Sequence, residues 1–303
     1  MKTLHIINPK AGAGDYKNVS SKLPKTEDEI YTAGYYAEAY EKFPFLRAGE
    51  LTEVYAFGGD GTVNRVVSDI MMCGTNENTI LCPVPTGSGN DFYKTIHEKC
   101  EKVSVIECDV IKITGLGNDI YGINEVNIGF DCGVVANAAK YKRKPFVSGQ
   151  LSYILGIAEE FFRKKTTELK LSITTDDGDE AHDGRYLLMC IANGIYYGGG
   201  FAAAPLSHLD DGYFDVVVVD DISRMKFVAL VGDYKKGAHM DSASGAVKSE
   251  FQNLMRYFRA RCVTLSGADR ICVDGEIYSA VGRRMTIENI KRALRVRDAL
   301  GGR

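Results

Sequence analysis

The stretch that most constrains the fold of this sequence is a glycine-rich turn at residues 58–62, Gly-Gly-Asp-Gly-Thr. An apolar run of strand-forming residues precedes it, and apolar residues recur at helical spacing over 63–70. The pattern therefore predicts a strand, a tight turn and a helix. Glycine lets a ligand approach the backbone, and the free N–H groups that begin a helix suit phosphate. Asp60 lies among those donors, and a carboxylate beside phosphate indicates an intervening divalent cation such as Mg²⁺.

Length and composition describe an ordinary globular protein. The chain has 303 residues, enough for two lobes, and its net charge of -3 gives no general attraction to nucleic acid. No apolar run reaches membrane-spanning length, and the apolar start is broken at Asn8-Pro9, which favours a first strand over a signal peptide. The eight cysteines include no Cys-x-x-Cys pair, which indicates reduced thiols in a cytoplasmic protein.

The first hundred residues alternate between predicted strands and helices, which is typical of an α/β lobe with a parallel sheet and flanking helices. Strands are expected at 3–8, 29–32, 51–57 and 79–84. Loops after Asn8, Phe57 and Val84 would then emerge at one carboxyl edge, where open α/β sheets bind ligands. Neither the ordinary dinucleotide fingerprint nor a P-loop is present.

From about residue 105 the pattern changes to short predicted strands separated by turns, which is typical of an antiparallel β-sandwich. The strands are expected at 103–113, 119–127, 169–175, 185–193, 213–220, 261–266, 270–273 and 284–290. Helices are expected at 151–165 and 225–237. The prediction is thus a nucleotide-binding lobe at 1–104 and a sandwich lobe at 105–290, with 291–303 a candidate for rejoining the first lobe.

Three segments of the first lobe resemble signatures of the diacylglycerol kinase catalytic family: Asn8-Pro9, the 58–62 turn, and the loop Pro85 to Asp91. Five further segments occur in the family's order, at 127–131, 198–200 followed by Pro205, 210–212, 236–239 and 274–276. This family includes bacterial lipid kinases and is similar to sphingosine and ceramide kinases. It belongs to a wider group with NAD kinases and phosphofructokinases. The resemblance covers nearly the whole chain and implies two lobes with nucleotide between them.

The resemblance also implies which residues form the site. Those expected to bind nucleotide are Asn8, Gly58, Gly59, Asp60, Gly61, Thr62, Gly87, Ser88, Asn90, Asp91 and Glu276. Asp60 would organise metal and phosphate, and it would form a water-linked network with Asp91 and Asp211.

Asp274 is the expected general base. It follows a predicted strand and precedes Gly275, so a tight turn can project its carboxylate. Phosphoryl transfer to an alcohol needs alignment, charge neutralisation and a group that takes the hydroxyl proton, and partial burial would raise the pKa of a carboxyl usefully. The pattern alone predicts an Asp-Gly hairpin turn equally well; the resemblance places the base here.

A second acidic turn is Asp210-Asp211-Gly212. The resemblance implies that the Asp211 side chain holds a structural Mg²⁺ together with the backbone carbonyls of His208 and Tyr213, and hard oxygen ligands suit Mg²⁺ or Ca²⁺. Without the resemblance this turn is typical of a solvated surface turn. One departure from the family is Arg65, where glutamate is usual; the other is Ser88, which keeps the hydroxyl of the usual threonine.

One stretch is a candidate for contact with a membrane. Basic residues at 140–144 precede an apolar helical run over 146–162, and Arg163-Lys164-Lys165 follows. A helix with one apolar side and basic ends can lie on anionic headgroups. The same pattern is more often that of a helix packed on its own sandwich.

We expect a cytoplasmic, ATP- and Mg²⁺-dependent kinase that phosphorylates a lipid hydroxyl such as that of diacylglycerol, at the membrane surface and without a nucleic-acid partner. One alternative is an NAD kinase-like enzyme for a soluble acceptor. The other is a nucleotide- or lipid-binding regulator without turnover, which only Arg65 suggests. The acceptor, the nucleotide and the oligomeric state stay open, with a homodimer as one option.

Overall fold

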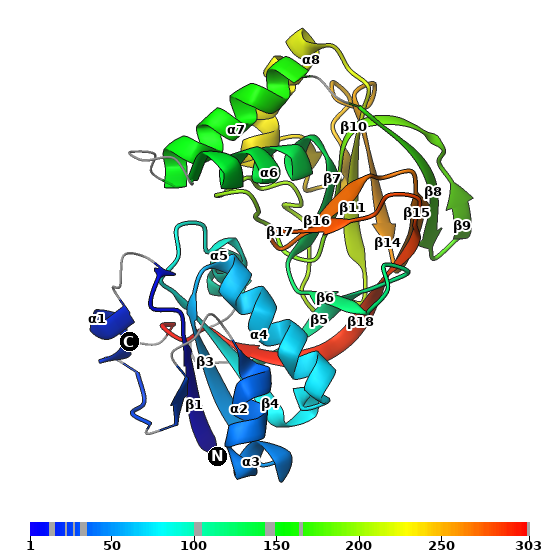
Figure 1. The fold of residues 1–303 in the computed structure, drawn as a ribbon. Helices are drawn as coiled ribbons and strands as arrows, with labels where there is room; N and C mark the ends of the chain where they lie inside the picture. The colour runs from blue at the N-terminus through cyan, green and yellow to red at the C-terminus, as the bar shows by residue number, and fades with distance from the viewer. Residues whose placement is uncertain are drawn as a thin grey trace.

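The computed structural model describes residues 1–11, 16–21, 23–26, 28–30, 35–99, 105–142, 149–163 and 166–301. They form an α/β lobe and a β-sandwich lobe, and the last strand runs from the second lobe into the first (Figure 1). This is the predicted fold class. The seven cysteines within these ranges are free thiols. None of the helices described is both long enough and apolar enough to cross a bilayer.

The first lobe is built on parallel strands in the order β2-β1-β3-β4. Their bounds are β1 Lys2–Ile7, β2 Glu29–Ile30, β3 Thr52–Gly58 and β4 Thr79–Pro85. Ile7 is paired with Phe57 and Phe57 with Val84, so three strands end at the same level. All of β3 is buried, as expected for a parallel strand covered on both faces. The register therefore brings the three predicted loops to one edge.

Helices cover this sheet. Their bounds are α1 Tyr16–Ser20, α2 Tyr36–Lys42, α3 Pro44–Arg47, α4 Asp60–Cys73 and α5 Asp91–Lys99, with a short 3₁₀ turn η2 at Asn76–Asn78. The predicted helix after the glycine-rich turn is α4, and its apolar stripe enters the core of the lobe. It ends at Gly74, whose φ of 66° is left-handed and whose N–H caps the last carbonyls.

The second lobe is a sandwich of antiparallel strands. Their bounds are β5 Val105–Thr114, β6 Ile120–Gly122, β7 Glu125–Gly129, β8 Thr167–Thr175, β9 Gly178–Ala181, β10 Gly184–Ala192, β11 Phe214–Asp220, β12 Met240–Asp241, β13 Ala246–Val247, β14 Met255–Ala260, β15 Cys262–Ser266, β16 Arg270–Val273, β17 Glu276–Ser279 and β18 Arg284–Arg297. Three helices, α6 Phe130–Lys142, α7 Gly149–Arg163 and α8 Arg224–Lys236, lie on one side (Figure 1). They share an apolar core with β10 and β11.

One prediction about these elements was wrong, and several elements were not predicted. Residues 119–127 form two strands, because the N–H groups of residues 123–125 turn away to bind the Asp274 carboxylate. Helix α6 was missed because its apolar residues do not lie on one stripe, so its sequence lacks helical periodicity. The edge strand β14 was missed because its middle residues are only partly buried and mix charged with aromatic types.

Strand β18 connects the lobes. Its first half is paired with β15 and β5, and its second half is paired with β5 and, in parallel, with β4. The prediction ended this strand at Ile290. The pairing is irregular between Ile290 and Leu294, where Arg292 has a φ of 52°, and it resumes beyond. Leu294 and Val296 then enter the core of the first lobe.

We expect Leu294→Ala to lower the free energy of unfolding by about 2–4 kcal/mol, because it removes a fully buried side chain from the strand that both lobes share. Val281→Ala is the control, since Val281 is exposed and should change stability by less than about 0.5 kcal/mol. Urea unfolding of both variants measures this, and equal effects would contradict the role given to β18.

Candidate active site

The two glycine-rich loops of the first lobe touch each other. The Gly58 carbonyl accepts hydrogen bonds from the N–H groups of Thr86 and Gly87, at 3.1 and 3.2 Å. A Cβ atom on Gly87 would lie 2.3 Å from Gly59 Cα, so only glycine fits at this crossing. Asn90, with a φ of 57°, closes its own loop through two hydrogen bonds to the Gly87 backbone. The loops thus brace each other around the start of α4.

The other predicted nucleotide residues border this crossing. Asn8 Nδ2 donates to Thr62 Oγ1 at 3.0 Å, which joins the loop after β1 to the start of α4. The N-cap of α4 is a glycine without a capping side chain, so the N-terminal N–H groups lack that acceptor. Glu276 reaches over from the second lobe: a Cβ on Gly61 would lie 3.3 Å from Glu276 Oε1. Ser88 is exposed on its loop.

Asp274 joins the lobes. Its side chain is 2% exposed, and its φ of 46° is left-handed. Oδ1 accepts from the N–H groups of Asn124 and Glu125, at 3.0 and 2.8 Å. Oδ2 accepts from the Ile123 N–H at 2.8 Å and from Asn64 Nδ2, on α4, at 2.9 Å. The helix that begins at Asp60 in the first lobe and the Asp274 turn of the second lobe are therefore joined by the hydrogen bond from Asn64.

Four carboxyl groups interact in this place. Burial, followed by the charge of Asp91, raises the pKa of Asp60 to about 6, against the hydrogen bond from the Phe92 N–H. Burial, then the charges of Asp274, Asp60 and Asp91, raises the pKa of Glu125 well above its ordinary value. Burial also raises the pKa of Asp274, although its four hydrogen bonds oppose this. The charges of neighbouring carboxyls thus make Asp60 and Glu125 harder to ionise.

Little positive charge offsets this cluster. Asp91 forms an ion pair with Lys94 at 2.8 Å and accepts from the Gly199 N–H at 2.6 Å. Across the described ranges, no three His, Cys, Asp or Glu side chains are placed to hold a metal ion between them. Mg²⁺ commonly takes one or two carboxylates and completes its shell with substrate phosphates and water. The cluster fits an ion that arrives with a nucleotide.

Comparison with known proteins agrees with this geometry. The model of the diacylglycerol kinase catalytic domain matches residues 2–114, and that of the YegS C-terminal NAD kinase beta sandwich-like domain matches 124–297, more than half of the chain. The chain belongs to the diacylglycerol kinase catalytic-domain family.

One relative and one solved structure match nearly the whole chain, and another relative matches 58% of it. "Putative lipid kinase YtlR" of Bacillus subtilis is 25% identical over 309 residues, which cover 92% of this chain and 94% of that protein. "Probable lipid kinase YegS-like" of Chromohalobacter salexigens is 26% identical over 58% of this chain and 56% of its own. The crystal structure titled as a putative diacylglycerol kinase from Bacillus anthracis superposes with a TM-score of 0.70 at 21% identity, covering 97% of this chain and 96% of that one. That structure shares the fold.

Three residues of the site were not predicted from the sequence: Glu125, Asn64 and Lys94. Glu125 was hidden inside a predicted strand, and its signal was a carboxylate in an otherwise apolar run that is paired on both sides. Asn64 follows the glycine-rich turn in the first turns of α4 and had no assigned role. Lys94 lies one helical turn after Asp91, a spacing that brings the two side chains together.

The predicted structural cation is not favoured by the residues at its turn. Asp211 Oδ2 lies 2.5 Å from Arg259 Nη2, and Asp211 Oδ1 accepts from the Tyr213 N–H. The Tyr213 carbonyl, a second expected ligand, accepts from Asn289 Nδ2 at 3.2 Å. A guanidinium therefore supplies the positive charge here, and we derive no cation at this turn. The hydrogen bonds described for Asp211 do not reach Asp60 or Asp91, so their water-linked network stays a prediction.

Arg65, the departure from the usual family glutamate, is engaged by neighbours in the first lobe. Its Nε lies 3.3 Å from the buried Asp69 carboxylate one turn along α4, and its guanidinium stacks 5.3 Å from the centre of the Tyr35 ring. The charge of Arg65 therefore has a partner within α4.

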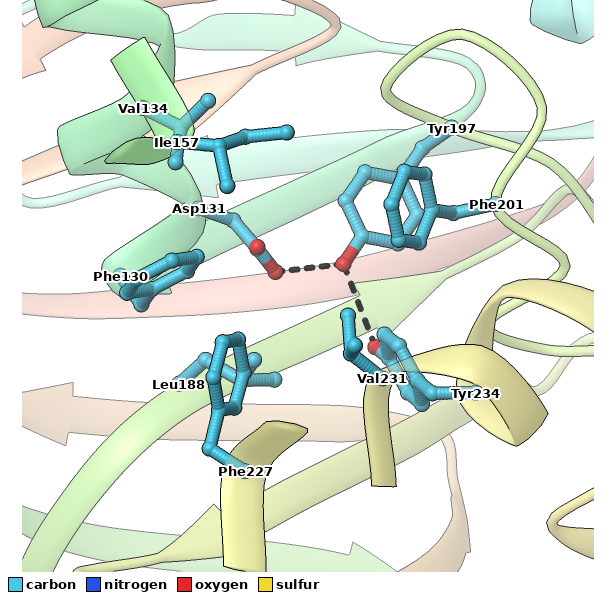
Figure 2. A pocket seen from close by; sticks show the side chains of 10 residues that line it. All are labelled: Phe130, Asp131, Val134, Ile157, Leu188, Tyr197, Phe201, Phe227, Val231 and Tyr234. Carbon is cyan, nitrogen blue, oxygen red and sulfur yellow. Dashed lines mark hydrogen bonds between the residues drawn. The ribbon is translucent and has the colours of Figure 1, made fainter. Parts of the chain in front are cut away.

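An apolar pocket lies in the second lobe, with about 420 Å³ of empty space that is partly open to solvent (Figure 2). Its lining residues are Phe130, Asp131, Val134, Ile157, Leu188, Tyr197, Phe201, Phe227, Val231 and Tyr234. The Tyr197 hydroxyl donates to Asp131 at 2.5 Å and lies 3.3 Å from the Tyr234 hydroxyl, which makes one polar chain inside an apolar wall. Burial raises the pKa of Asp131 to about 6.

We expect Asp60→Asn to be more stable than the wild type at pH 8. Burial raises the pKa of Asp60 from 3.8 to about 6, so ionising it costs folding free energy as the pH rises through that range. At about 1.4 kcal/mol per pKa unit, the advantage of the variant reaches up to about 3 kcal/mol. Below pH 4 both side chains are neutral and the advantage should vanish.

Urea unfolding in EDTA from pH 4 to 8 measures this difference. Asp119→Asn is the control, because Asp119 is half exposed. Its difference from the wild type in the free energy of unfolding should change little with pH. A stability difference for Asp60→Asn that does not grow with pH would contradict the carboxyl cluster.

We expect the Tm of the wild type, without nucleotide, to be the same in EDTA and in millimolar Mg²⁺, because Arg259 neutralises Asp211. Arg259→Gln should destabilise the protein by about 1 kcal/mol, the range of a half-exposed pair, and should gain stability with Mg²⁺. A wild-type Tm that rises with Mg²⁺ would show that a cation displaces the arginine.

Proposed function

We propose that this chain is an ATP-dependent kinase that transfers the γ-phosphoryl group to the hydroxyl of a lipid, with diacylglycerol as the first candidate. The observation that carries the proposal is the hydrogen bond between the lobes, from Asn64 on α4 to the Asp274 carboxylate. The buried Asp274 carboxylate of the second lobe thus lies near the glycine-rich loops at Gly58 and Gly87, which are suited to binding phosphate. The family and the lipid kinases among its relatives support the same reaction class.

The first lobe supplies the nucleotide end. The braced loops at Gly58 and Gly87 offer backbone close to the start of α4, where the helix dipole favours phosphate. Mg²⁺, when bound with ATP, neutralises phosphate charge. The carboxyls of Asp60 and Asp91 are the candidates to orient it, because they lie at the first turns of α4 and α5.

The pocket of Figure 2 supplies the acceptor end. Strand β7 begins at Glu125, whose N–H binds Asp274, and it leads directly into Phe130 and Asp131 of the pocket wall. Five strand residues at about 3.3 Å each separate the two places by roughly 16 Å, a span that a long acyl chain can cover. The loop that carries Tyr197 also presents the Gly199 N–H to Asp91. The apolar wall and the carboxyl cluster are thus held by shared elements.

The reaction needs one proton transfer. As the acceptor oxygen forms its bond to the γ-phosphorus, the bond from that phosphorus to the bridging β-oxygen breaks and ADP leaves. The acceptor O–H proton passes to the Asp274 carboxylate. Burial raises the pKa of this group and makes it a better base. The four hydrogen bonds to Asp274 fix its orientation.

The two alternatives lose support. A polar acceptor such as NAD would not use a pocket lined mainly by aromatic and aliphatic side chains. The regulator without turnover rested on Arg65, and the charge of Arg65 is engaged by Asp69.

The test is phosphorylation of acceptors by the purified chain with γ-labelled ATP and Mg²⁺. We expect label in diacylglycerol or in another lipid of a total extract, and none in NAD. Label in NAD alone would overturn the lipid acceptor, and ATP binding without any labelled product would favour the regulator.

We expect Asp274→Asn to lower turnover by about 10²–10⁴-fold, the usual contribution of a general base, while ATP binding persists. The amide NH₂ also faces N–H donors, so a lower Tm is expected as well. Asp215→Asn is the control: it removes another buried carboxyl of raised pKa, bonded to Tyr257, and should keep turnover. Wild-type turnover in folded Asp274→Asn would remove the assignment.

A further inference from the structure

Helix α7 exposes apolar side chains where a soluble helix normally exposes polar ones. Its outward stripe is Leu151, Ile154, Ala158 and Phe162, at spacings of three and four residues. Ile154 is 61% and Phe162 is 75% exposed. The polar side chains of Ser152 and Glu160 are buried instead. Apolar side chains therefore lie on both sides of α7, because Ile157 and Phe161 pack against the core while the stripe faces solvent.

Helix α8 continues the same surface. Met225 is 85% and Val228 is 58% exposed. The guanidinium of Arg224 donates to the carbonyls of Phe161 and Phe162, at 3.1 and 2.6 Å, so the start of α8 is fixed to the end of α7. Leu151, Ile154, Phe162, Met225 and Val228 together are called the α7/α8 face. Contiguous exposed apolar side chains on two joined helices indicate a partner.

The charges around the α7/α8 face identify that partner. Helix α8 carries four basic residues, Arg224, Lys226, Lys235 and Lys236, against one acidic residue, Asp233. On α7 the Glu159 carboxylate is already bound by Arg163. The border is therefore positive although the whole chain has a net charge of -3. Apolar side chains within a basic border match an anionic lipid surface, in which the side chains enter the acyl region and the basic groups meet the phosphates.

The α7/α8 face also lies over the apolar pocket. Ile157 of α7 and Phe227 and Val231 of α8 line the pocket from inside (Figure 2), while Ile154 and Val228 point to solvent on the same helices. Lys235 sits 5.4 Å above the ring of Phe201, another lining residue. A lipid could thus pass from a bilayer into the pocket with little exposure to water.

We infer that the α7/α8 face docks on anionic bilayers and delivers the lipid acceptor to the pocket. The inference deepens the proposed function and rests on it for the identity of the pocket's ligand. The segments 143–148 and 164–165, which hold the other basic residues of the predicted membrane stretch, lie outside the described residues. The inference does not use them.

The test is flotation of the purified chain with vesicles of phosphatidylcholine, alone or with phosphatidylglycerol. We expect binding to the anionic vesicles that falls with salt, and a loss of roughly tenfold or more in Phe162→Ser/Met225→Ser. Lys226→Glu should weaken binding to anionic vesicles only. The matched control is Met72→Ser/Val281→Ser, which removes two exposed apolar side chains elsewhere and should bind as the wild type.

A second readout separates this inference from the kinase proposal. With a short-chain diacylglycerol in solution, the α7/α8 variant should keep wild-type turnover, and with vesicle-borne diacylglycerol its turnover should fall. Vesicle binding that both double variants share equally overturns the docking face, whatever the kinase assays give. A dimer of this chain that Phe162→Ser/Met225→Ser dissociates, without vesicle binding, overturns it in favour of a second copy. Face-dependent vesicle binding with no labelled lipid overturns the kinase proposal and leaves the docking face.

Discussion

The rest of the structure depends on the hydrogen bonds that the Asp274 carboxylate accepts. Three come from consecutive backbone N–H groups, of Ile123, Asn124 and Glu125, and one comes from Asn64 of the other lobe. The backbone bonds break a predicted strand in two, and the Asn64 bond sets the distance between the lobes. A buried carboxylate would be costly alone; here four donors satisfy its oxygens and fix its orientation.

Electrostatics gives the buried carboxyl cluster and the turn at Asp211 different roles. Asp60, Asp91, Glu125 and Asp274 share a buried place with little positive charge, and burial raises the pKa values of Asp60, Glu125 and Asp274. That arrangement costs stability and is typical of a functional site. The Asp211 turn is different, because Arg259 neutralises it. The carboxyl cluster is suited to binding a cation together with phosphate, whereas Asp211 forms an ion pair with Arg259.

The second lobe combines an apolar pocket with an apolar outer face on the same helices. Inside, Ile157 and Phe227 pack around the empty volume; outside, Phe162 and Met225 meet solvent. An apolar pocket beneath an apolar outer face suits a ligand that resides in a bilayer and must leave it to reach the site. The sequence showed the apolar content of α7 but not which side faced out.

What the sequence determined by itself was local. Glycines at 58, 59 and 61 after an apolar strand specify a strand–turn–helix unit, and alternation of strand and helix specifies the parallel first lobe, because both depend on neighbours in the chain. Only tertiary structure decided that Glu125 and Asn64 belong to the site, that Arg259 lies against Asp211, and that one strand serves both lobes. These depend on contacts between residues 48 to 215 positions apart, such as Asp211 with Arg259 and Ile80 with Arg295, and no local pattern encodes which side chains long-range packing brings together.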